Sequence, residues 1–155
     1  MLTKLSNLLC TSLGLAQTEH QEGHSLQVAT AVLLSEVMRA DSEIAESEQA
    51  ALRRILKERF NLSDDEAGRL AQRGRAASLD ASDLYQFTSA INQALDLPER
   101  VQIMEYLWQV ALADSRLDAY ENHLMRRLAD LLYIGHGDYV AAKTRARNLL
   151  GLPPE

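Results

Sequence analysis

The sequence predicts an all-α fold: a single domain of about seven to eight helices with an internal two-fold repeat of a helix–acidic loop–helix unit. Apolar residues recur at helical spacing along most of the 155 residues, and alternating β-branched runs are nearly absent. The prolines, Pro98, Pro153 and Pro154, interrupt no expected helix interior. A composition of 46% hydrophobic and 25% charged residues is that of a globular chain able to bury a core.

The N-terminal segment, residues 1–23, is expected to form a short amphipathic helix followed by a polar linker. The helix is expected to end near Gly14, with the linker over residues 17–23. Polar residues interrupt its apolar run, which indicates a helix rather than an export signal or a membrane anchor. The leucines expected on its apolar face are Leu2, Leu5, Leu9 and Leu13.

The domain itself is assigned to residues 24–151, with a tail over residues 152–155. Its first two helices are predicted from apolar residues at a spacing of three or four, and a short loop after Asp41 joins them. The residues expected to face the core are Leu26, Ala29, Leu33, Leu34, Val37 and Met38 in the first helix, and Leu52, Ile55, Leu56 and Phe60 in the second.

Start signals place the middle helices of the domain. Ser63 with Glu66 three residues later has the spacing of a capping box, so a helix is expected from there to about Ala77. Another is expected over residues 83–94, and Pro98 suits the first turn of the next. The core-facing residues of that next helix are Val101, Met104, Leu107, Val110 and Ala111.

The last two helices follow the same periodicity. The final helix is expected over residues 138–150 and ends at Gly151, because glycine favours the left-handed backbone of a helix terminus. The helix before it carries Leu124, Leu128, Leu131 and Leu132.

An internal repeat relates the two halves of the chain at an offset of 73 positions. Ala40-Asp41-Ser42 matches Ala113-Asp114-Ser115, and Glu48 matches Glu121. The shared pattern is an Asp, two variable residues, an aliphatic residue, three variable residues and a Glu. Two copies indicate a duplicated unit rather than a solenoid. Further matches are Leu34 with Leu107, Val37 with Val110, and Arg53-Arg54 with Arg126-Arg127.

The acidic residues of this repeat are the candidate functional residues: Asp41, Glu48, Asp114 and Glu121. Each Asp continues an apolar helix face, where a carboxylate needs water, amide hydrogens or a cation. If a metal binds, four carboxylates suit Ca²⁺, Mg²⁺ or Mn²⁺ better than zinc or copper. The alternative is structural, since Asp118 and Glu121 have the spacing of a helix cap. Ala45, which stands at the corresponding position of the first unit, cannot cap.

Residues 40–48 and 113–121 resemble the paired signatures of the tellurite-resistance TerB-like family, and the similarity extends over residues 24–150. The resemblance implies an α-helical bacterial protein of the cytoplasm that acts in stress response and associates with a protein partner in the cytoplasm or at the inner membrane. It also implies that the same four acidic residues bind a metal. Ser42 and Ser115 stand where family members often carry glycine.

Other functions find little support in the sequence. A net charge of −6 argues against nucleic acid as a partner. No phosphate-binding glycine loop, serine elbow or cysteine–histidine pair indicates an enzyme or a small-molecule substrate, and no cofactor other than a divalent cation is expected. The alternatives are a protein–protein interaction module whose acidic residues only cap helices, and a metal-dependent hydrolase. His20 and His24 have helical spacing but lack a third zinc ligand nearby.

Overall fold

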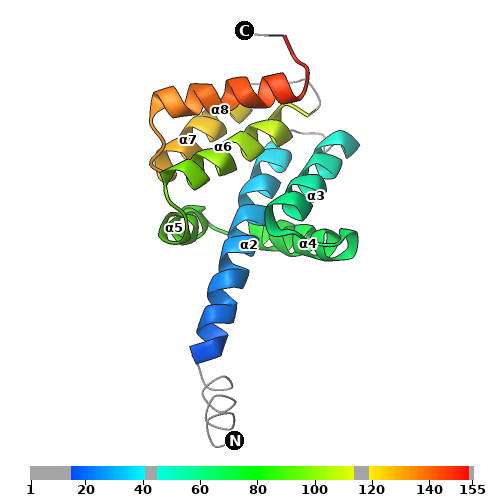
Figure 1. The fold of residues 1–155 in the computed structure, drawn as a ribbon, viewed down its shortest axis with the longest axis vertical. Coiled ribbons are helices and arrows are strands. Elements are labelled where there is room, and N and C mark those ends of the chain that lie inside the picture. The colour runs from blue at the N-terminus through cyan, green and yellow to red at the C-terminus, as the bar shows by residue number, and fades with distance from the viewer. Residues whose placement is uncertain (1–14, 41–44, 114–118, 154–155) are drawn as a thin grey trace, which may run out of the picture.

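The computed structural model describes residues 15–40, 45–113 and 119–153 (Figure 1). This part of the chain forms seven helices and no strand, which confirms the all-α prediction. The helices are α2 (Leu15–Ala40), α3 (Glu46–Phe60), α4 (Asp64–Asp80), α5 (Tyr85–Ala94), α6 (Leu97–Ala111), α7 (Ala119–Leu131) and α8 (His136–Leu149).

Helix α2 is the central element of the fold. It contacts α3, α4, α5, α6 and α7, and Figure 1 shows its N-terminal part extending beyond the other helices. Because neighbours cover it on several sides, consecutive residues from Ala31 to Ser35 are all buried, whereas a surface helix buries only one stripe. These five helices therefore pack around α2.

One secondary-structure prediction at the N-terminus is wrong. Residues 17–23 were expected to form a polar linker, but they are helical and continue without a break into the buried part of α2. Gly23 lies within this helix despite its low helix propensity. The predicted helix over residues 2–14 lies outside the described residues, and the boundary at residue 24 stays a prediction.

Helix ends in the middle of the chain agree with the predicted start signals. The Glu66 backbone N–H donates to Ser63 Oγ at 3.2 Å, and the Ser63 N–H donates to Glu66 Oε1 at 3.1 Å, which completes the capping box. The bond from the Ser63 backbone N–H lowers the pKa of the Glu66 carboxyl, and the Ser63 side chain lowers it further. Pro98 lies in the first turn of α6, and Gly151 follows α8 with a φ of +69°.

Helices α6 and α8 lie side by side and bury the single tryptophan between them. Trp108 is fully buried, its ring centre lies 5.4 Å from that of Tyr139, and Lys143 Nζ lies 5.0 Å from its ring centre. The aromatic contact and the cation–π contact both join α6 to α8.

Helices α2 and α4 approach each other closely at Gly74. A Cβ atom added to Gly74 would lie 2.7 Å from the carbonyl carbon of Ala31 and closer still to its Cβ. Ala31 is fully buried, so neither helix can move aside without disturbing the core. Gly74 lies in the interior of α4, so it is not a helix-terminating glycine. Glycine is required here because a side chain would collide with α2.

We expect Gly74→Ala to lower the free energy of unfolding by up to about 2 kcal/mol, because overpacking costs about 1–3 kcal/mol and the gain in helix propensity is roughly 1 kcal/mol. Gly68→Ala is the matched control in the same helix, where an added Cβ meets nothing within 4 Å. It should stabilise by about 0.5–1 kcal/mol. Urea denaturation measures both, and equal signs for the two variants would contradict the assignment.

Candidate functional site

The structure places two of the four predicted acidic residues. Glu48 lies in the first turn of α3 and Glu121 in the first turn of α7. Both are buried, with relative exposures of 1% and 2%. Asp41 and Asp114 lie outside the described residues, so the structure does not test whether all four come together.

Glu48 has a structural role that sequence reasoning underestimated. Its Oε1 accepts a hydrogen bond of 3.3 Å from the backbone N–H of Ala45, the residue that precedes α3. This is half of a capping box, because Ala45 has no side-chain oxygen to return the bond. Glu48 also takes part in further interactions, so its carboxylate is partnered.

Glu121 occupies the corresponding place in the second half of the chain. Helices α3 and α7 begin at residues 46 and 119, which keeps the offset of 73 positions found in the sequence. Like Glu48, Glu121 is buried and has a partner. Buried pairs at this offset are Leu52 with Met125, Ile55 with Leu128, and Leu56 with Ala129. The duplication itself stays a prediction.

A metal ion would need more ligands than these two glutamates. Among the described residues, no group of three or more His, Cys, Asp or Glu side chains is placed to hold a metal. A site formed by the repeat therefore requires Asp41 or Asp114. The oxygen donors fit Ca²⁺, Mg²⁺ or Mn²⁺, and burial next to helix N-termini would limit their exchange with water.

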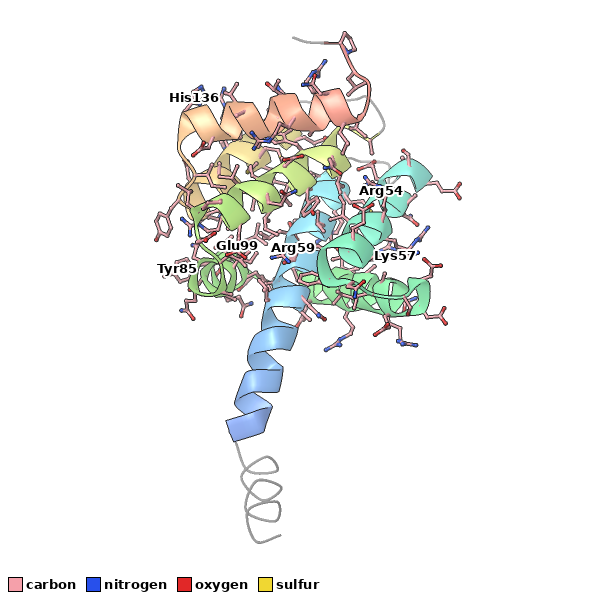
Figure 2. The ribbon with its side chains drawn as sticks, viewed as in Figure 1. Arg54, Lys57, Arg59, Tyr85, Glu99 and His136 are labelled. Atoms are coloured by element: carbon pink, nitrogen blue, oxygen red, sulfur yellow. The ribbon has the colours of Figure 1, made fainter. Side chains whose placement is uncertain are left out.

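The histidines supply no alternative centre in the described part of the chain. His123 and His136 are exposed, and the His136 ring stacks near Tyr139 with 6.0 Å between ring centres. Figure 2 shows His136 at the start of α8. The side chains of His20 and His24 lie outside the described set, so the zinc alternative is untested.

A cationic cleft between α3 and α4, here called the α3–α4 cleft, was missed by the sequence analysis. Its volume is about 350 Å³. The sequence does contain a signal for this cleft, because α3 carries small and cationic residues at helical spacing on one face. The sequence analysis interpreted these residues only as part of the internal repeat. The residues that line it are Ala50, Arg53, Arg54, Lys57, Asp64 and Ala67.

A second, smaller cleft, called the α7–α8 cleft, lies at the start of α8. Its volume is about 160 Å³. Neither cleft is lined by Glu48 or Glu121, so these hollows are separate from the predicted acidic site. The residues that line the second cleft are Arg126, Ala129, Asp130, Ile134, His136 and Tyr139.

The described helices include none long and apolar enough to cross a membrane. The longest, α2, has 26 residues and combines polar and apolar positions along its length.

The described residues form an all-α domain in which helices pack around a central helix. One buried glutamate lies at the start of α3 and another at the start of α7, so the domain has paired acidic elements. The family model described as "Tellurite resistance protein TerB" matches residues 27–144, more than half of the chain. The chain therefore belongs to the TerB family, and the resemblance inferred from the acidic signatures is confirmed. No curated protein and no solved structure matches it.

We expect Glu48→Ala to destabilise chelator-treated protein by about 1–3 kcal/mol, because it removes the acceptor of the Ala45 N–H and leaves a buried gap. Glu46→Ala is the matched control, since Glu46 lies in the same helical turn but is exposed. Its effect should stay within about 0.5 kcal/mol. Thermal or urea unfolding distinguishes the two, and an equally small effect of both would argue against a structural role for Glu48.

Proposed function

We propose that this TerB-family protein is a non-enzymatic binding module of a bacterial stress response, with a divalent-cation site formed by Asp41, Glu48, Asp114 and Glu121. The family description supports the link to tellurite resistance. The observation that carries the cation site is the burial of Glu48 and Glu121, each at the start of a helix and 73 positions apart.

Burial of a carboxylate supports this proposal through its energetic cost. An ionised carboxylate removed from water must recover several kcal/mol from hydrogen bonds or from a cation. Helix N-termini supply part of the compensation, since their partial positive charge favours anions. Both glutamates also have other partners, and a divalent cation shared with Asp41 and Asp114 would add to this compensation and would tie the two halves of the domain together.

A second candidate function is favoured by the hydrogen bond between Glu48 and Ala45. If this bond and the remaining partners already compensate the buried carboxylates, the acidic residues are structural, and the module acts only by binding a protein. The partner proposed from the family resemblance is a protein in the cytoplasm or at the inner membrane, and the module would work in the cytoplasm. A hydrolase is not proposed, because neither described cleft includes Glu48 or Glu121.

Thermal unfolding of chelator-treated protein with Ca²⁺, Mg²⁺, Mn²⁺ or Zn²⁺ titrated in tests the cation site. At about 100 times the Kd, an ion stabilises the fold by about 2.7 kcal/mol. For a chain of this size, that is a rise in Tm of roughly 5–10 °C. We expect this rise with one of the oxygen-preferring ions and its loss in Asp41→Asn and Asp114→Asn.

The control for this titration is Asp80→Asn, because Asp80 is an exposed carboxylate at the end of α4. This variant should keep the full response of the wild type. If no ion changes the midpoint of the wild type, the cation site is wrong and the structural role of the acidic residues is supported. A zinc response retained in both Asp variants would indicate the histidines instead.

A further inference from the structure

The α3–α4 cleft carries more positive than negative charge. Arg53, Arg54 and Lys57 line it together with a single carboxylate, Asp64. Figure 2 shows Arg54 and Lys57 extending from α3. This local excess occurs in a chain whose net charge is −6, so it does not follow from the overall composition.

The three cations differ in how far they are already partnered. Lys57 Nζ lies 2.8 Å from Asp64 Oδ1, and this bond and the charge of Lys57 lower the pKa of Asp64, so the Asp64 carboxylate stays ionised at neutral pH. Arg53 is exposed and forms no ion pair with any residue in the described ranges. One cation is therefore free to bind an anion.

Arg54 is held in place by a residue of another helix. Its Nη2 donates a hydrogen bond of 3.1 Å to Oε1 of Gln109, a residue of α6 that is only 2% exposed. Its contact with Glu58 is longer, at 3.6 Å. Because a guanidinium has five N–H donors, Arg54 keeps donors available while its position is fixed. A ligand would then lose little affinity to side-chain ordering.

Small residues keep this cleft open. Ala50 lies on the α3 side and Ala67 on the α4 side. In the α7–α8 cleft, where Arg126 stands 73 positions after Arg53, the aromatic residue Tyr139 forms part of the wall and the volume is less than half as large. That wall also carries Asp130, whose carboxylate would repel an anion. Of these two clefts, only the α3–α4 cleft combines open space with excess positive charge.

We infer that the α3–α4 cleft binds a small phosphate-type oxyanion through Arg53, Arg54 and Lys57. Guanidinium groups bind such anions through paired N–H bonds, and an ammonium adds a mobile point charge. A volume of about 350 Å³ is sufficient for a small phosphorylated compound. The negative net charge disfavours an extended polyanion such as nucleic acid, so the ligand is a free small molecule.

Calorimetric titration of pyrophosphate into the full chain tests this inference, at constant ionic strength and with chelator present. Chelation keeps the test independent of the proposed cation site, whose residues do not line the cleft. We expect saturable binding that Arg53→Gln and Lys57→Gln each weaken about tenfold or more, since each removes a charge-assisted bond. Ala50→Leu should weaken it as well, by filling the cleft without changing its charge.

Arg126→Gln is the matched control, because it removes an arginine of the α7–α8 cleft. It should change the Kd less than twofold. No pyrophosphate binding would overturn the inference, as would equal losses from Arg53→Gln and Arg126→Gln. Vesicles containing phosphatidylglycerol form a second arm. Binding to vesicles that depends on Arg53, without binding of pyrophosphate, would overturn the free-ligand assignment in favour of a lipid headgroup.

Discussion

The close packing of α2 against its neighbours is the constraint on which the rest of the structure depends. Five helices contact α2, and its consecutive residues from Ala31 to Ser35 are all buried. Gly74 of α4 lies against Ala31, where the helices approach so closely that a methyl group does not fit. This contact fixes the position of α4, and α4 in turn forms one wall of the cationic cleft.

The same packing decides how the buried glutamates can act. Glu48 and Glu121 open the helices that pack on the core, so their carboxylates are removed from water along with the apolar residues that follow them. The bond from the Ala45 N–H partly compensates Glu48 and makes it a helix-start residue as well as a candidate ligand. A structural role and a cation-binding role are compatible, because a carboxylate has two oxygens and about four acceptor positions.

Charge in this protein is distributed locally rather than uniformly. Glu48 and Glu121 lie in the first turns of α3 and α7, whereas three cations of α3 gather at a cleft that Ala50 and Ala67 leave open. Neither Glu48 nor Glu121 lines the cleft, although Glu48 belongs to α3, which forms one of its walls. Glu48 and the cations lie on one short helix, so a cation at one end and an oxyanion along its side would act on the same structural element.

The sequence by itself determined the helical class, the capping box of Ser63 and Glu66, the place of Pro98 and Gly151, and the TerB family, because these depend on spacing along the chain. Only the tertiary structure decided that residues 17–23 are helical, that Glu48 is buried and bonded to Ala45, and that Ala67 leaves a cleft open. These features arise from contacts between distant segments: a helix continues through polar residues without a local signal, and the space beside an alanine depends on the helix that packs against it.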